Sequence, residues 1–267
     1  KGDVDGAFRK IIEARKLLAG RPGSVWNYHL DVHTAALHIR LGDLDNAARY
    51  MDFKRLGLYD PLSSVREYEY ILYARFLMLT KHTDDALILL GRLTNFAKKE
   101  NQLGRQIEIL CLEALCYARK GDSTGASAAL YNALALGAGH GYVRTFADEE
   151  EPMAQLLERY VKSVRDGGGQ LAYSRSLMDA ARGYAGILKE YRQKQSAGKQ
   201  KMGARFLTSR EIEILGLLAE RYSNEDIAKK LFYSLSGVKR CNTRIFTKLG
   251  VKDRHEAVEK ATKLGLI

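Results

Sequence analysis

The chain has 267 residues, 46% of them hydrophobic, which suffices for two domains with buried cores. Only three prolines and little Val/Ile alternation favour an all-α protein over a sheet protein. No apolar run has membrane-spanning length, no signal peptide is evident, and Cys111, Cys116 and Cys241 have neither disulfide-framework nor zinc spacing, so we expect a reduced protein of the cytoplasm with no membrane partner.

The formal net charge of +11 is concentrated at the C-terminal end. Residues 182–267 hold 19 Lys and Arg against 9 Asp and Glu, whereas residues 1–181 hold 24 against 23. A positive excess in one region is typical of a part that faces a polyanion, whereas a surface charged only for solubility would spread it. The C-terminal third is therefore the candidate nucleic-acid-binding part.

The first part of the chain repeats itself. A turn of small and polar residues precedes an alanine four times, and these alanines lie 40, 39 and 40 residues apart, at Ala7, Ala47, Ala86 and Ala126. Such a period is typical of stacked helical hairpins, in which alanine lets neighbouring helices approach closely. We predict hairpins throughout residues 1–165, with helices over 70–79 and 86–96 in the third copy and over 107–119 and 126–136 in the fourth. The pattern begins at the first residue, so we expect earlier repeats upstream.

A hairpin solenoid offers a concave surface for a small molecule or a protein partner. His29 and His33 have the i, i+4 spacing of metal ligands, but the residues between them do not complete a zinc-protease motif, so packing or surface roles are favoured. Cys111 and Cys116 lie on an apolar helix, which is typical of small core residues. We predict no metal site.

Two further segments follow the repeats. Three glutamates before Pro152 favour the start of a helix over 153–164, because negative charge stabilises a helix N-terminus. Residues 166–205 are predicted to be a flexible segment, with a D-G-G-G break, a short helix over 171–191 and a polar, basic linker over 193–205. No phosphate-binding loop motif occurs in the chain, and no catalytic constellation of side chains is evident.

Residues 206–267 form four short helical patterns. Their capping signals are Thr208 with Glu211, Ser223 with Asp226, Ser236 before Val238, and Asp253 with Glu256. Gly250 and Gly265 stand where a left-handed residue would end a helix. A compact four-helix unit with a basic third helix is a candidate helix-turn-helix domain.

The third helix, over 236–249, has two faces at the helical period. Val238, Ile245 and Leu249 gather on one side, flanked by Phe246 and Cys241. Cations and hydroxyls occupy the opposite side, at Lys239, Arg240, Thr243, Arg244 and Thr247. Such a face suits the DNA major groove, although an ordinary solvated helix face is about equally compatible with the pattern alone.

Ordered motifs in this domain resemble the LuxR-type helix-turn-helix. They are L-T-x-R-E-x-E-x-L-x-L-L-A over 207–219, S-N-E-D-I-A-x-x-L over 223–231, V-K at 238–239 and I-x-x-K-L-G-V-x-x-R-x-E-A-V over 245–258. The repeats, with Y-x-R-x-F-x-D-E over 142–149, resemble the C-terminal part of the large MalT-like regulators. In that group an ATPase precedes the repeats, so the resemblance implies that ATP binds only to a domain absent from this chain, which itself needs no cofactor.

The resemblance also assigns roles to residues. It places Lys239, Arg240 and Thr243 at base-contacting positions, and Lys248 and Ser223, with neighbouring Asn224, where the DNA backbone is held. The last helix would supply a dimer face that includes Val258 and Ala261. Three positions depart from the family pattern: Gly237 where Thr is usual, Cys241 where His is frequent, and Arg221 where Gly is common.

The leading hypothesis is a bacterial transcription regulator, an activator, that binds double-stranded DNA as a homodimer or oligomer. Its repeats would receive a small-molecule inducer or a protein partner, and RNA polymerase is a further candidate partner. One alternative is an interaction scaffold whose terminal domain has weakened or lost DNA binding, as Gly237 and Cys241 suggest. An enzyme has little support, and an RNA-binding protein would lack the usual aromatic platform.

Overall fold

The computed structural model describes residues 3–18, 25–164, 169–196, 207, 209–231, 233–264 and 266–267. Every regular element within these ranges is a helix, which confirms the all-α prediction. The described residues form two compact units, one made of residues 38–190 and the other of 3–37 together with 191–267. None of the helices in the described ranges is long and apolar enough to cross a membrane.

The first two helices are α1 (Val4–Leu17) and α2 (Val25–Leu41). Asp3 caps α1, because its side chain accepts a hydrogen bond from the amide of Gly6 at 2.7 Å. The guanidinium of Arg15 is buried between the helices, 3.1 Å from a carboxylate oxygen of Asp31 and 3.1 Å from the hydroxyl of Thr34. This charge-assisted contact ties α1 to α2.

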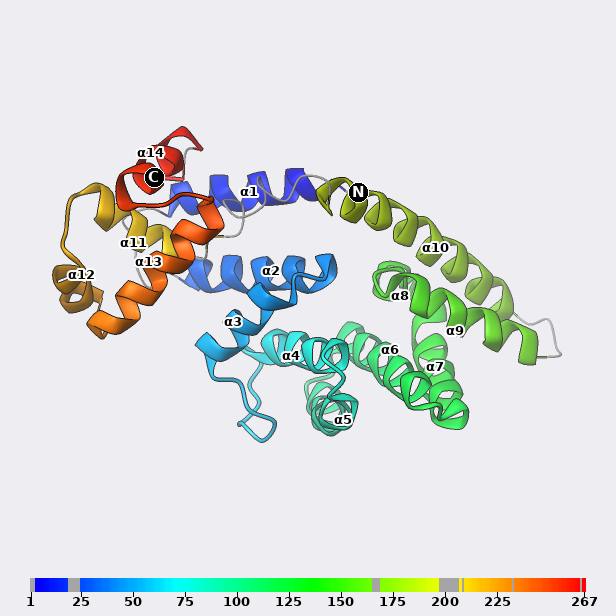
Figure 1. Cartoon of the computed structure of the whole chain (residues 1–267). Helices are drawn as coiled ribbons and strands as arrows, with labels where there is room; N and C mark the ends of the chain where they lie inside the picture. Colours follow the sequence, from blue (N-terminus) through cyan, green and yellow to red (C-terminus); the bar gives the residue numbers. More distant parts are fainter. Residues whose placement is uncertain are drawn as a thin grey trace. The chain divides into compact units, whose positions relative to one another are not determined.

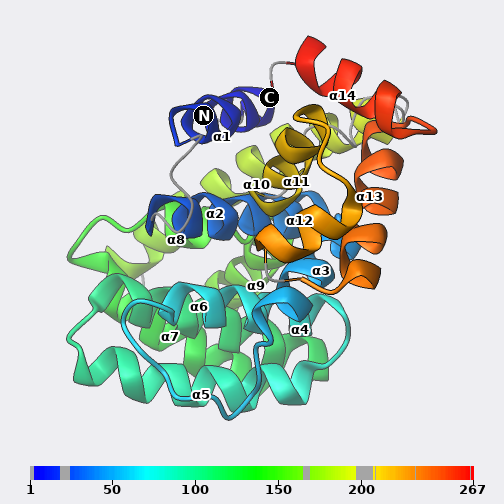
Figure 2. The same ribbon diagram turned by 90° about the vertical axis from the view of Figure 1, so that its left-hand side faces the viewer.

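Helices packed as hairpins follow in chain order (Figure 1). α3 (Leu44–Lys54) packs against α4 (Glu67–Leu79), α4 pairs with α5 (Thr83–Lys99), and α6 (Leu103–Lys120) pairs with α7 (Ser123–Ala138). Figure 2 shows α4 and α6 above α5. The predicted helices of the third and fourth copies lie inside α4 to α7, so the hairpin prediction is confirmed for these two copies.

The recurring alanines pack where the hairpins close. Ala47 and Ala86 are 0% exposed and Ala126 is 2% exposed, so the small side chain at this position lets two helices approach closely. Ala7, the first of the series, is only half-buried. The period of the sequence therefore corresponds to the packing period of the helices.

Each hairpin turn contains a left-handed residue at the same place. These residues are Gly42 (φ 76°), Lys81 (φ 69°) and Gly121 (φ 78°). After each of them, the next amide donates back to a carbonyl five residues earlier, which satisfies an unpaired group at the end of the helix. Asp43 and Asp122 then cap the following helix. Lys81 adopts the conformation that glycine prefers, and this strain is absent from the other two turns.

The segment after α7 differs in detail from the prediction. It comprises α8 (Arg144–Ala147), α9 (Glu150–Ser163) and α10 (Gly169–Ser196). α9 begins three residues before the predicted start, so Glu150 and Glu151 form its first turn. α10 is longer than the predicted helix and takes in the first residues of the predicted linker. The remainder of that linker and residues 165–168 lie outside the described residues.

Consecutive acidic residues between α8 and α9 are bound by arginines of earlier helices. Arg40 of α2 lies 2.7 Å from the carboxylate of Asp148. Arg75 of α4 bonds both Glu149 and Glu108, the latter at 2.8 Å. Burial opposes the charge on Arg75, but the two glutamates outweigh it and raise the pKa of Arg75. Buried charges thus link helices that are far apart in the sequence.

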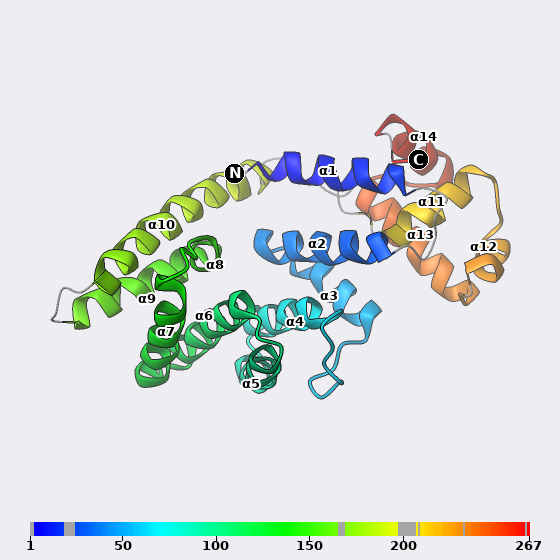
Figure 3. The ribbon, with the colours of Figure 1, turned by 180° about the vertical axis from the view of Figure 1, so that it is seen from behind.

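The C-terminal helices are α11 (Ser209–Ala219), α12 (Asn224–Leu231), α13 (Leu235–Leu249) and α14 (Arg254–Lys263) (Figure 3). They surround a core to which every one of them contributes, including Ile214, Ile227, Ile245 and Ala257, all 0% exposed. Within the part of the chain that the structure describes, no group of three or more His, Cys, Asp or Glu side chains could hold a metal ion. His29 and His33 are both exposed on α2.

Candidate nucleic-acid interface

The basic helix α13 begins earlier than predicted. Its cap is Ser234, whose hydroxyl accepts a hydrogen bond from the amide of Gly237 at 3.1 Å. Ser236, the predicted cap, instead lies inside the first turn, with its hydroxyl 3.1 Å from that of Ser234. Both serines fit the capping preference, and the sequence alone could not decide between them. Gly250 ends the helix in a left-handed conformation (φ 63°), as predicted.

The two faces of α13 are those that the helical period predicts. Val238, Ile245 and Leu249 are 0% exposed. The outward side chains are Lys239, Arg240, Thr243 and Thr247, which are all exposed. The hydroxyls of Thr243 and Thr247 donate to carbonyls four residues earlier, at 3.1 and 2.8 Å, so their methyl groups and oxygen lone pairs remain for a ligand. Two cations and two threonines therefore form one accessible surface, called here the reading face.

Arg244 lies at the edge of the reading face. Its side chain is half-buried and its guanidinium bonds the sulfur of Cys241. Cys241 is only 4% exposed, and it belongs to the core of the domain. Cys241, which stands where His is frequent in the family, therefore points inward and is not part of the reading face. Arg244 is less accessible than the wheel predicts.

Lys248 is also placed differently from the prediction. Its ammonium lies 2.6 Å from a carboxylate oxygen of Glu211 on α11, and the side chains of the two residues are 7% and 6% exposed. A buried ammonium in an ion pair does not reach a phosphate at the surface. The expectation that Lys248 holds the DNA backbone is corrected on this ground: it joins α13 to α11.

The helix before α13 carries the other predicted backbone contacts. Ser223 and Asp226 form the predicted capping box: the amide of Asp226 donates to the hydroxyl of Ser223 at 3.1 Å, and the amide of Ser223 donates to the carboxylate of Asp226 at 3.3 Å. Ser223 is exposed and Asn224 half-buried, at the N-terminus of α12. The end of a helix with its partial positive charge suits a phosphate.

Asn242 is a residue that sequence reasoning missed. It is 7% exposed, and its amide nitrogen donates to the side-chain oxygen of Asn224 at 2.7 Å, which links α13 to α12. Its own side-chain oxygen is buried without a hydrogen-bond partner among the described residues. The sequence does hold a signal for it, because Asn242 is a polar residue that lies beside the apolar side of the predicted helix. This contact fixes the angle between the two helices that would face DNA.

Comparison with known proteins agrees with this arrangement. Residues 2–163 match the MalT-like TPR region, and residues 205–261 match the bacterial regulatory proteins of the luxR family. The chain belongs to the MalT-like TPR family, with a LuxR-family DNA-binding domain. No solved structure matches it.

Curated relatives are similar to a quarter of the chain. The oxygen regulatory protein NreC of Staphylococcus aureus strains JH9, JH1 and USA300 is 48% identical over 63 residues, which are 24% of this chain. The chain spans only 29% of the length of these relatives. The similarity therefore concerns a short part of each protein and carries nothing about the rest of this chain.

The last helix of the LuxR-family domain only partly fits the predicted dimer face. Ala261 is 0% exposed and belongs to the domain's own core, so it cannot also contact a partner, and this part of the prediction is wrong. Val258 is half-buried and packs against the same core. The exposed side of α14 carries His255, Glu259 and Lys263. Arg254 donates to the carbonyl of Leu218 at 2.7 Å, which fastens α14 to the end of α11.

The other two departures from the family pattern have structural explanations. Arg221 has a φ of 64°, so it occupies the left-handed position after α11 at which glycine is common. Gly237 lies in the first turn of α13, where an added Cβ would be 3.1 Å from the hydroxyl oxygen of Ser234 and 3.2 Å from the Tyr233 ring. A larger residue there would require small shifts of these side chains. Neither departure alters the reading face itself.

Proposed function

We propose that the chain is a sequence-specific transcription regulator that places α13 in the major groove of double-stranded DNA. The observation that carries the proposal is the reading face: Lys239, Arg240, Thr243 and Thr247 are exposed together on a helix whose opposite side is core. Lysine and arginine bond guanine edges and phosphates, and threonine contacts a thymine methyl group. The N-terminus of α12, with Ser223, would bind the adjacent phosphate.

The regulator would act as an activator and would bind paired half-sites as a homodimer. Val258 and the exposed side chains of α14 are the candidate contacts between subunits. The compact unit of residues 38–190, called here the repeat unit, would receive the signal, either a small molecule or a protein partner. RNA polymerase would be the target of activation. NreC is named a regulatory protein, which is compatible with such a role for the shared domain.

Fluorescence anisotropy with a duplex selected from a random-sequence library tests this function. Lys239→Ala and Arg240→Ala should each weaken binding to the selected duplex, whereas Lys189→Ala, at an exposed position on α10, should have no effect. A side chain that bonds a phosphate should lower the salt slope by about 1 unit when removed, and one that reads a base should instead relax the sequence preference. Failure to select any duplex would contradict the proposal.

The scaffold alternative predicts a different result in the same assay. Gly237 weakens the first turn of α13, because glycine has poor helix propensity. If this departure had abolished DNA binding, Gly237→Thr would create binding that the parent chain lacks. Binding by the parent chain excludes the alternative.

A further inference from the structure

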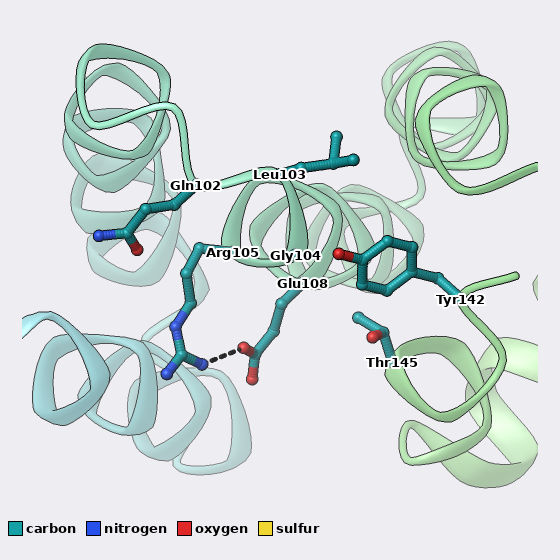
Figure 4. A pocket seen from close by; sticks show the side chains of 7 residues that line it. All are labelled: Gln102, Leu103, Gly104, Arg105, Glu108, Tyr142 and Thr145. Carbon is teal, nitrogen blue, oxygen red and sulfur yellow. Dashed lines mark hydrogen bonds and ion pairs between the residues drawn. The ribbon is translucent and has the colours of Figure 1, made fainter. Parts of the chain in front are cut away.

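A pocket of about 360 Å³ opens between the N-terminal turn of α6 and α8, within the unit of residues 38–190. Most of its lining is polar: Gln102 is the N-cap residue of α6, Arg105 and Glu108 lie on α6, Tyr142 lies just before α8, and Thr145 lies on α8. Figure 4 shows Arg105 on one side of Glu108, and Tyr142 and Thr145 on the other. The volume lies at the lower end of the range of small-molecule sites.

The centre of the pocket holds a cation and an anion side by side. A guanidinium nitrogen of Arg105 lies 2.8 Å from one carboxylate oxygen of Glu108, and Arg75 lies 2.8 Å from the other oxygen. Burial opposes ionisation of Glu108, but Arg75 and Arg105 outweigh it and lower the pKa of Glu108. The pocket therefore presents an ionised carboxylate directly beside a guanidinium.

Several donors in the pocket remain available. Among the described residues, Arg105 donates a hydrogen bond to Glu108 through one terminal nitrogen, and its Nε is 3.9 Å from Glu67, which is too long for a hydrogen bond. Its guanidinium also lies over the Tyr68 ring, 4.7 Å from the centroid. Its side chain is 35% exposed. Gly104 lets the Tyr142 ring lie close to α6, because a Cβ at this position would be 3.3 Å from the ring. The hydroxyls of Tyr142 and Thr145 can therefore serve a ligand next to the charged pair.

The charges at the pocket limit the class of ligand. Arg105 offers a guanidinium and Glu108 a carboxylate, and the buried carboxylate of Glu67 lies 3.9 Å from Arg105, so a ligand with only one kind of charge would be attracted by one group and repelled by another. A simple carboxylate would bond Arg105 but would repel Glu108. A molecule that carries a carboxylate and an ammonium on one carbon satisfies both groups and adds no net charge.

We propose that this pocket binds a zwitterionic α-amino acid. The carboxylate of the ligand bonds the open N–H groups of Arg105, its ammonium bonds Glu108, and its side chain lies towards Tyr142 and Thr145. The proposal rests on the proposed function in one respect: it names the class of small molecule that the repeat unit senses. The binding itself requires no DNA and can be measured without it.

Nuclear magnetic resonance of the full 267-residue chain tests the site. The probes are the proteinogenic L-amino acids, added one at a time at about 10 mM, which detects dissociation constants in the millimolar range. For each amino acid that binds, the matched carboxylic acid without the amine and the matched amine without the carboxylate are added separately. Sodium chloride at equal ionic strength controls for general salt effects.

The expected result is a saturable shift of the Gly104 and Thr145 amide signals with one or a few amino acids, and none with the matched acid or amine. Arg105→Gln should weaken binding about tenfold or more, because it removes a charge-assisted bond. Arg159→Gln, at an exposed position on α9 of the same unit, is the matched control and should bind as the parent does. If Arg105→Gln does not fold, Tyr142→Phe and Thr145→Val remove one hydroxyl each and should change which amino acids bind.

Three outcomes would overturn the proposal: no shift with any amino acid, equal shifts with the matched acid or amine, or equal loss of binding in Arg159→Gln. DNA binding is measured separately by fluorescence anisotropy. If the chain binds an amino acid but no DNA, the proposed function is refuted and the proposed amino-acid site still holds.

Discussion

The ammonium of Lys248 lies 2.6 Å from a carboxylate oxygen of Glu211, and both side chains are almost fully buried. The pair connects the basic helix α13 to α11 through the centre of the LuxR-family domain. A buried ion pair is not by itself strongly stabilising, but removal of one partner leaves an uncompensated charge in the interior. We therefore expect Lys248 to support the structure of the domain rather than to contact DNA.

We expect Lys248→Met to destabilise the C-terminal domain by about 3 kcal/mol, because the buried carboxylate of Glu211 loses the charge-assisted hydrogen bond that Lys248 donates. Hydrogen exchange measured by mass spectrometry on α11 and α13 of the full chain reports this loss locally. The control is the double variant Glu211→Leu with Lys248→Met, in which most of the stability should return. The opposite result would be a single variant that stays stable but whose DNA affinity depends less steeply on salt, by about one unit of slope. That result would return Lys248 to the role of a phosphate contact.

The start of α13 can be tested by two serine substitutions. Ser234→Ala should cost about 1 kcal/mol, because the amide of Gly237 loses its capping acceptor. Ser236→Ala should lower the stability of the helix much less, because Ser236 lies within the first turn and the cap of the helix is Ser234. The measurement is amide exchange over residues 235–240. Equal losses in the two variants would show that the cap is shared.

Lys81→Gly should stabilise the repeat unit. Lys81 has a φ of 69°, in the region where Gly42 and Gly121 stand in the equivalent turns. A left-handed conformation costs an L-residue about 1–2 kcal/mol, and the greater freedom of glycine in the unfolded chain offsets about half of it, so the expected gain is about 0.5–1 kcal/mol. Urea unfolding followed by circular dichroism measures the gain. Lys81→Ala removes the same charge without relieving the strain and should show none.

Asp43 should make the repeat unit sensitive to acid. Burial raises the pKa of Asp43, but hydrogen bonds with His38 and Asn46 outweigh it and lower the pKa to about 2. Because the folded-state pKa lies below the unfolded value of about 4, the stabilisation is complete above pH 4 and is lost as the pH falls towards 2. The lowered pKa of Asp43 contributes about 2 kcal/mol to the free energy of unfolding.

Asp43→Asn keeps a capping side chain but carries no charge. The difference in unfolding free energy between parent and variant should therefore be largest near pH 5 and should shrink between pH 4 and pH 2. Urea unfolding at several pH values measures it, with Asp45→Asn, at a neighbouring exposed position on α3, as the control. A difference that does not depend on pH would contradict the assigned cause.

The periodic parts of the structure could be predicted from sequence. Ala47, Ala86 and Ala126 mark the hairpins because a close helix approach requires a small residue each time, and the two faces of α13 follow from the helical period. Helix caps could also be predicted from the sequence where only one candidate residue existed, as at Ser223 and Asp226.

Contacts between segments far apart in the chain could not be predicted from the sequence. Nothing local distinguishes Lys248, buried against Glu211, from Lys239, which is exposed, because the partner lies 37 residues away. The same reason hid the bond between Asn242 and Asn224, and the inward direction of Ala261. The pocket beside Arg105 was hidden likewise, since its walls come from helices that only the fold brings together.

Asp148 and Glu149 bond Arg40 and Arg75, and so connect α2 and α4 directly to the end of the repeat unit. In an ordinary solenoid each repeat contacts only its neighbours, and the array can melt one repeat at a time. Here, loss of the segment from α8 to α9 would remove Asp148 and Glu149, the carboxylates that bond arginines of two earlier helices. The repeats are consequently thermodynamically coupled from end to end, and we expect them to melt in a single cooperative transition.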